Sequence, residues 1–322
     1  MNHSSGVGRE LADPLKCHFP LPHSATFYPL GFSVQVESNS KDILAAAEES
    51  WGAWRRQYDA EPVRLKIAVA PEGDLAIAPE YRAQEHLLTI VSDQNNYAVV
   101  DLDRLFGSAV LSQTTAGDHA WLRWYFLEAM AYCSLSQRYV APIHAASVSR
   151  KGMGVLIFGP SGAGKSTLAY ACARAGWVFT SDDASNLLQD SSGLTIIGKP
   201  HQARFRDDAP ELFPELSGYS VRARPHGKLS LEVPLDELEG IRTSPTCELG
   251  CIVTLNRGYA PRLERISGEE LIEEFLSHAC FYGNRTFERH RRTLQRALEK
   301  PVYRMDYRTL DEAIEMLERI TE

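Results

Sequence analysis

The amino-acid sequence predicts an α/β fold, and three observations support that class. An apolar, strand-like run at residues 155–158 enters a glycine-rich loop, and the loop leads directly into a helical pattern at residues 166–175. Short strand-like runs alternate with amphipathic helical segments before and after this unit. A chain of 322 residues is long enough for two domains. We therefore expect a larger C-terminal domain built around the loop and a smaller α+β domain before it.

The first third of the sequence divides into an arm and a small domain. Residues 1–25 mix Pro, Gly, Ser and His without a helical or strand period, so we expect a flexible arm there. Residues 26–118 are expected to form the α+β domain, with a role in recognising a substrate or partner. One helix is predicted at residues 43–54, and strands are predicted at residues 32–37, 63–69, 87–92 and 97–102.

Residues 119–322 are expected to form the larger domain. A long helix over residues 122–133 is predicted to open it, after a polar break at residues 114–118. The later elements are two strands and two helices that begin at capping boxes: residues 143–149, residues 251–255, Ser267 with Glu270, and Thr309 with Glu312.

The glycine-rich loop matches the eight-residue Walker A pattern at every required position. Small residues let successive backbone N–H groups curl around an anion, and the helix that follows directs the positive end of its dipole to the same place. Lys165 is expected to reach the β- and γ-phosphates of ATP, and Ser166 to hold Mg²⁺. The predicted nucleotide-binding residues are Gly159, Pro160, Ser161, Gly162, Ala163, Gly164, Lys165, Ser166 and Thr167.

Two acids, Asp182 and Asp183, follow the next predicted strand, at a strand end where such sheets bind ligands. Phosphoryl transfer needs a carboxylate for Mg²⁺ and a group that accepts the proton of the nucleophile, so the two acids can divide these roles. If the strand continued through both, only one would face the loop. Which acid holds the metal and which is the base stays open. We interpret residues 119–322 as a P-loop kinase domain.

The segment from His144 through the Walker A loop to Asp183 resembles the kinase domain of the HPr kinase/phosphorylase family, in which a histidine precedes the loop and two acids follow it at the same intervals. The resemblance implies an HPr kinase/PEP carboxykinase-like fold for this domain. It also implies roles for single residues: Asp183 as the catalytic acid/base, His144 as an active-site residue, Lys165 as a catalytic phosphate contact, Ser166 as a magnesium contact, and Asp182 as the supporting, metal-holding carboxylate.

Residues 29–52 are similar to the divergent HPr-kinase-related proteins, some of which phosphorylate lasso-peptide precursors. This resemblance implies a kinase that uses ATP and Mg²⁺ to phosphorylate a serine hydroxyl on a protein or peptide partner, and it implies a homo-oligomer. HPr, a biosynthetic peptide and a small molecule such as free serine are alternative acceptors. A nucleotide-binding regulator without transferase activity is an alternative class.

A GTPase is a further alternative that matches less of the sequence. Residues 190–193 spell the magnesium-proximal pattern of that class, but the guanine-reading Asn-Lys-x-Asp motif is absent, because Asn256 is followed by Arg257. Five further cationic side chains could clamp a phosphate or an acidic substrate: Lys228, Arg289, Arg291, Arg292 and Arg296. For the four arginines we favour a solvent-exposed helix face instead.

Composition excludes several classes of partner. The formal net charge is −8 and no basic tract is present, which argues against a nucleic-acid surface. No apolar run approaches the ~20 residues that cross a bilayer, and the first residues lack the pattern of a signal peptide, so we expect a cytoplasmic protein with no membrane partner. The six cysteines are scattered, and Cys247 and Cys251 have no second pair in zinc-binding register.

Overall fold

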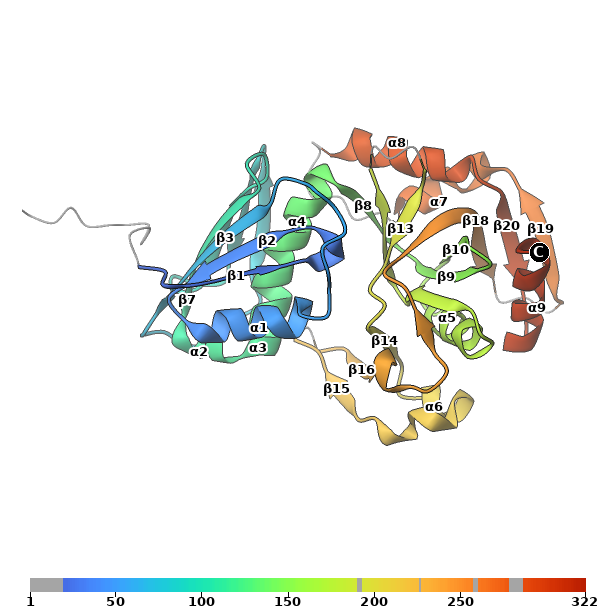
Figure 1. Ribbon diagram of the computed structural model, residues 1–322, viewed down its shortest axis with the longest axis horizontal. Coiled ribbons are helices and arrows are strands. Elements are labelled where there is room, and N and C mark those ends of the chain that lie inside the picture. Colours follow the sequence, from blue (N-terminus) through green and yellow to red (C-terminus); the bar gives the residue numbers. More distant parts are fainter. Residues whose placement is uncertain (1–19, 190–192, 226, 257–259, 278–285) are drawn as a thin grey trace, which may run out of the picture.

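The computed structural model describes residues 20–189, 193–225, 227–256, 260–277 and 286–322, and its architecture is mixed α/β, in agreement with the predicted class. Two bodies lie side by side, each built on a large sheet, and a small third sheet lies below the second body in Figure 1. Among the described residues, the three sheets contain seven, ten and three strands.

The first sheet contains strands from residues 23–112. Its order is β1 (His23–Phe27), β2 (Val34–Ser38), β3 (Val63–Ala70), β7 (Phe106–Ser112), β6 (Tyr97–Asp101), β5 (Leu87–Val91) and β4 (Glu80–Gln84). The four strands predicted in this region are present, whereas β1, β4 and β7 are additional. β1 shortens the expected arm, because His23 pairs with Ser38 of β2. Residues 1–19 of that arm lie outside the described residues.

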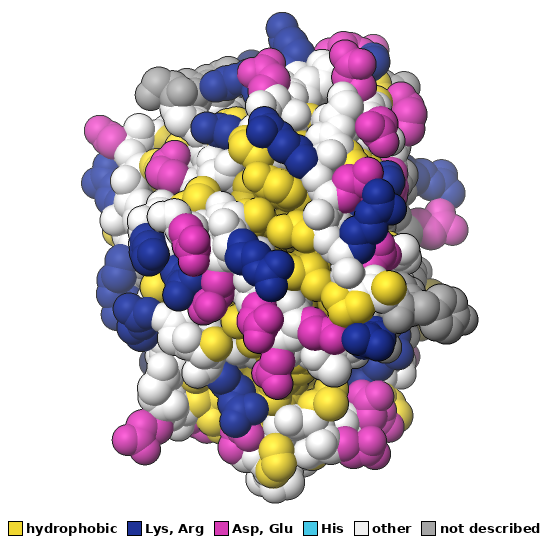
Figure 2. Space-filling model, turned by 90° about the vertical axis from the view of Figure 1, so that its right-hand side faces the viewer, with side chains coloured by type: hydrophobic (Ala, Val, Ile, Leu, Met, Phe, Trp, Pro, Cys, Tyr) yellow, Lys and Arg dark blue, Asp and Glu magenta, His cyan; other side chains and the backbone are white. Residues whose placement is uncertain are grey.

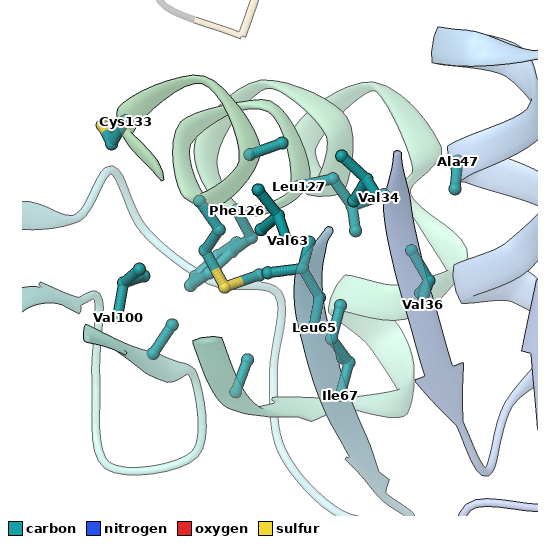
Figure 3. Packing of buried hydrophobic residues seen from close by; sticks show 14 of the residues in the cluster. Val34, Val36, Ala47, Val63, Leu65, Ile67, Val100, Phe126, Leu127 and Cys133 are labelled. Carbon is teal, nitrogen blue, oxygen red and sulfur yellow. The ribbon is translucent and has the colours of Figure 1, made fainter. Parts of the chain in front are cut away.

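One face of this sheet is buried by helices. Apolar residues alternate along β2 and β3, so their side chains on one face are buried, and Figure 3 shows them packed beneath Phe126 and Leu127. The helical elements of this body are η1 (Pro29–Gly31), α1 (Lys41–Trp51), α2 (Gln113–Gly117), α3 (His119–Leu122), the π-helical turn η2 (Arg123–Leu127) and α4 (Glu128–Arg138). The helix predicted at residues 43–54 is therefore present but ends at Trp51.

The structure corrects the expected division after residue 118. The helix predicted to open the C-terminal domain instead buries its apolar face against the first sheet, where Leu122, Phe126, Met130 and Cys133 join the same core as Val34. An aliphatic and aromatic stripe must cover some apolar surface, and the nearest such surface is the sheet that precedes it in the chain. We therefore place the division near residue 139, where α4 has ended.

The second sheet carries the glycine-rich loop at residues 159–167, which is predicted to bind phosphate and is therefore named the phosphate loop. Its strands follow the order β17 (Arg242–Thr243), β11 (Val178–Ser181), β9 (Ala146–Arg150), β10 (Met153–Phe158), β18 (Thr246–Asn256), β13 (Thr195–Ile197), β12 (Ala184–Leu188) and β8 (Val140–His144), and β20 (Val302–Asp306) pairs with both β18 and β19 (Arg262–Ile266). The long strand β18 pairs with β13 through its first residues and with β10 and β20 through the rest. The strand predicted at residues 143–149 is divided into β8 and β9.

Helices cover both faces of this sheet. In β10, Val155 and Ile157 face a core shared with α5 (Lys165–Arg174) and α9 (Leu310–Ile320), while Leu156 and Phe158 face the opposite core, against α7 (Ile272–Ser277) and α8 (Phe287–Leu298). Burial on both faces explains why this strand is apolar throughout. Both predicted capping boxes are present, one opening η5 (Gly268–Leu271) and the other opening α9.

The small third sheet forms a wall beside α5. It consists of β14 (Gln202–Phe205), β16 (Leu229–Pro234) and β15 (Val221–Ala223), and it is accompanied by α6 (Ala209–Leu212), η3 (Pro214–Gly218) and η4 (Leu235–Glu237). Phe205 packs edge-on against Tyr170 of α5, with ring centroids 5.2 Å apart. The turn before β14 also contacts the first body, because His201 meets Trp54 edge-on. None of the described helices is long and apolar enough to cross a membrane.

Candidate active site

The phosphate loop lies between the end of β10 and the start of α5. Gly159, Gly162 and Gly164 have φ angles of 144°, 84° and 96°, a region of backbone space that favours glycine. A Cβ atom on Gly159 would lie 3.0 Å from the carbonyl oxygen of Leu255, so the loop is held close to β18. Gly164 is the N-cap residue and offers no side chain to the first N–H groups of α5, which are therefore suited to an anion.

The side chain of Lys165 is folded into this loop. The residue is 5% exposed, and its Nζ donates to the carbonyl oxygens of Gly159 at 2.9 Å and Pro160 at 3.4 Å. Burial lowers the pKa of the ammonium group, and the negative charge of Asp183 opposes that change. A phosphate bound in the loop would supply a partner of opposite charge to this desolvated cation.

Tyr307 contacts the phosphate loop from the interior of the protein. Sequence patterns do not distinguish it from an ordinary core residue. It follows β20, is 5% exposed, and its hydroxyl donates to the carbonyl oxygen of Ala163 at 2.9 Å. Because the peptide unit is planar and trans, fixing this carbonyl also fixes the direction of the N–H of Gly164 on the other side of the peptide. Tyr307 therefore positions a donor of the phosphate loop.

The two acids lie beside the loop, where β11 ends. β11 stops at Ser181, and Asp182 and Asp183 form a bend before β12. Strand alternation therefore does not apply to them, and both side chains line one cleft together with Lys165 and Ser166. Their surroundings differ, because Asp182 is 6% exposed whereas the side chain of Asp183 is 46% exposed. Two adjacent carboxylates thus occupy different environments in a single cleft.

Asp182 is held in place beside Ser166. Its Oδ2 accepts the backbone N–H of Arg204 at 2.8 Å, and the Ser166 hydroxyl donates to its carbonyl oxygen at 3.2 Å. Burial raises the pKa of the Asp182 carboxyl to about 6, Arg204 opposes the shift and Asp183 adds to it. The Ser166 hydroxyl and the Asp182 carboxylate fit Mg²⁺, which prefers oxygen ligands. A cation here would stabilise the ionised form that burial disfavours.

Replacing Asp182 by Asn is expected to stabilise the metal-free protein above pH 6. The folded wild-type protein holds the Asp182 proton more tightly than the unfolded chain, whose ordinary pKa is 3.8, so stability is lost as pH rises from about 4 to about 6 and stays lost above it. The amide carries no such cost. The gain should reach about 2 to 3 kcal/mol at pH 8 and vanish near pH 4. Urea unfolding across this pH range measures it, and an equal gain at pH 4 would contradict the assignment.

His144 meets Asp183 because of the register of two strands. β12 returns antiparallel to β8 and pairs Ala184 with His144, which brings the preceding Asp183 to the imidazole. The Nδ1 atom of His144 lies 3.1 Å from Oδ1 of Asp183, and both side chains line the cleft. A carboxylate in contact with an imidazole can be oriented by it and can accept a proton from a bound hydroxyl group.

Another wall of the cleft is rich in cations, which lie in the third sheet or next to the ends of its strands. Lys228, a candidate from the sequence, lies in this wall. The sequence did not indicate the other members, Arg204, Arg206 and Arg224. Arg206 reaches over the phosphate loop, because a Cβ atom on Gly162 would lie 3.1 Å from its guanidinium nitrogen. No sequence motif marks these arginines, which come together only when β14 and β15 both pair with β16.

The remaining candidates lie elsewhere. The arginines at positions 289, 291, 292 and 296 belong to α8 and are outside the lining of the cleft. Arg289 donates instead to the carbonyl oxygen of Gln137 at the end of α4. Residues 190–192 and Arg257, on which the comparison with GTPases depends, lie outside the described residues.

Comparisons with known proteins give no assignment of a family. No family model matches the chain, and no curated protein matches it. Among solved structures, the HPr(Ser) kinase/phosphatase from Coxiella burnetii is similar at 17% sequence identity, over 56% of this chain and 96% of that chain, with a TM-score of 0.30. Function must therefore be inferred from the residues of the cleft.

Proposed function

We propose that this protein is an ATP- and Mg²⁺-dependent kinase that transfers the γ-phosphoryl group to a serine hydroxyl of a protein or peptide. One observation carries the proposal: a glycine-rich phosphate loop and a carboxylate in contact with a histidine, Asp183 with His144, line the same cleft. A phosphate loop alone supports nucleotide binding. A half-exposed base beside it adds the group that phosphoryl transfer to a hydroxyl requires.

Each residue has a distinct part in the proposed reaction. The loop N–H groups and Lys165 hold the β- and γ-phosphates, and Ser166 and Asp182 hold Mg²⁺, which when bound neutralises phosphate charge. Asp183 takes the proton of the acceptor hydroxyl. The hydroxyl oxygen of the acceptor then bonds to the γ-phosphorus as the bond between that phosphorus and the bridging oxygen of ADP breaks. His144 orients the carboxylate. The more exposed position of Asp183 suits the base, because the acceptor must enter from solvent.

Labelled ATP tests this function directly. The protein is incubated with γ-labelled ATP, Mg²⁺ and, in separate reactions, a peptide library, HPr and free serine. We expect label on a serine of a protein or peptide. Label found only in released inorganic phosphate would indicate an ATPase, and nucleotide binding without any labelled product would indicate a regulator. A strong preference for GTP over ATP would also contradict the proposal.

A further inference from the structure

Two arginines in the wall of the cleft share a single carboxylate. Pairing of β14 with β16 sets Arg204 directly opposite Glu232, and the Nε of Arg204 lies 3.2 Å from Oε1 of Glu232. The Nε of Arg224 lies 3.9 Å from that same oxygen. The other oxygen of Glu232 accepts a hydrogen bond from Gln202 at 3.2 Å. One negative charge is therefore divided between two guanidinium groups.

This arrangement sets two guanidinium groups beside one directly paired carboxylate in a poorly solvated place, and Asp182 is a further negative charge that acts on both. The Arg224 side chain is 16% exposed, and its Nε also donates to the hydroxyl of Ser230 at 3.1 Å. Burial lowers the pKa of Arg224, and the neighbouring charge of Arg204 lowers it further. Two cations that repel each other away from bulk water are stabilised by an added anion. Guanidinium groups bind carboxylate and phosphate oxygens through paired N–H donors.

The wall differs from the outer surface of the same body. On the face shown in Figure 2, Lys and Arg side chains are interspersed with Asp and Glu around a band of hydrophobic side chains. In the cleft, the lining from the third sheet and its adjoining residues contains Arg204, Arg206, Arg224 and Lys228, with Asp208 as the one carboxylate among them. Such an excess of positive charge attracts anions, whereas an evenly mixed surface does not.

Arg204 is anchored beside the two acids of the cleft. The backbone N–H of Arg204 donates to Asp182, so β14 begins its contact with the site at the two acids. Arg206, two residues further along, reaches Gly162 of the phosphate loop. β14 and the residue that follows it thus place Arg204 beside the acids and Arg206 beside the phosphate loop.

We propose that Arg204 and Arg224 form an anion subsite that binds a carboxylate adjacent to the hydroxyl of the acceptor. This inference rests on the proposed kinase function and narrows the acceptor to a serine that carries a negative charge nearby. That charge has two possible sources: the α-carboxylate of a serine at the end of a chain, and an acidic side chain that flanks serine in a peptide. Either source would dock the hydroxyl beside Asp183.

Binding to the nucleotide-filled protein tests the subsite without relying on catalysis. The protein is first saturated with Mg²⁺ and a non-hydrolysable imido analogue of ATP, and inorganic phosphate is then titrated as a compact anion by calorimetry. We expect one saturable phosphate site. Arg224→Gln should weaken it about tenfold or more, as expected for loss of a charged hydrogen-bonding partner, and Arg224→Lys should give an intermediate affinity. Arg222→Gln, on the same small sheet but outside the cleft lining, is the matched control.

The outcomes separate this inference from the kinase function. Failure of the analogue to bind would count against the kinase function itself. If the analogue binds but phosphate does not, or if Arg224→Gln weakens the analogue as much as phosphate, the acceptor subsite is wrong. Competition then identifies the source of the charge: displacement of phosphate by L-serine but not L-serinamide indicates an α-carboxylate, and displacement by a capped Ser-Glu but not a Ser-Gln peptide indicates a flanking acid. If none displaces phosphate, the pair does not bind the acceptor.

Discussion

Replacing Asp183 by Asn is expected to lower the rate of phosphoryl transfer about 10²- to 10⁴-fold, the range associated with loss of a general base. The amide has the size of the carboxylate and can still contact His144, but it cannot take the proton of the acceptor. The effect should fall on kcat, because Lys165 and the loop N–H groups hold the nucleotide without help from Asp183. Single-turnover transfer from labelled ATP, together with analogue binding by calorimetry, measures the two quantities separately.

Two comparisons make this result specific. Asp207→Asn removes an exposed carboxylate from the same region that does not line the cleft, and it should transfer phosphate at the wild-type rate. His144→Gln should lower the rate of phosphoryl transfer. The further loss of rate should be much smaller when His144→Gln is added to Asp183→Asn than when it is made alone, because a positioning residue loses its effect once its partner is gone. Wild-type transfer by Asp183→Asn with intact nucleotide binding would disprove the role of Asp183. Additive losses would disprove the pairing with His144.

Local patterns predicted the phosphate loop and the elements on either side of it. The Walker A loop, the strand before it and the helix after it are adjacent in the chain, so glycine positions and apolar periodicity suffice to predict them. The same holds for α9, whose capping box involves Thr309 and Glu312. The contact between His144 and Asp183 spans the whole strand–loop–helix unit and depends on the register of β8 with β12, so only the resemblance to a family pointed to it.

The parts that the sequence did not reveal depend on non-local pairing. Arg204 and Glu232 face each other across two short strands, and each taken alone looks like an ordinary charged strand residue. The helix that carries Phe126 has the same apolar stripe whichever sheet it covers, so the stripe could not place the division between domains. Whether both acids face the cleft depended on where β11 ends, and strand ends are poorly determined by pattern.

The same contrast separates the two sides of the cleft under the proposed function. The loop side is built from contiguous residues and would bind an anion through backbone N–H groups. The wall that carries Arg204 and Arg224 is built from separate strands and would bind an anion through side chains. Substitutions in the wall can therefore alter recognition of an acceptor while the phosphate loop is preserved. Lys165 is the exception on the loop side, because it contributes a side-chain cation.

Replacing Lys165 by Met is expected to lower kcat/KM for ATP-dependent transfer about 10²- to 10³-fold, comparable to loss of a preorganised charge-stabilising donor. Methionine matches the length of the buried stem but supplies no cation to the γ-phosphoryl group, whose charge spreads over its oxygens during transfer. The protein should still fold, since burial already disfavours the ammonium and its Nζ is satisfied only by two carbonyl oxygens. Thermal unfolding should therefore occur at or above the wild-type temperature.

Lys300→Met, an exposed substitution outside the cleft lining, should leave transfer unchanged. If a folded Lys165→Met protein transfers phosphate at the wild-type rate, the phosphate loop is not part of the catalytic site. Loss of transfer with a stable fold identifies the buried ammonium as the cation that acts on the transferred group.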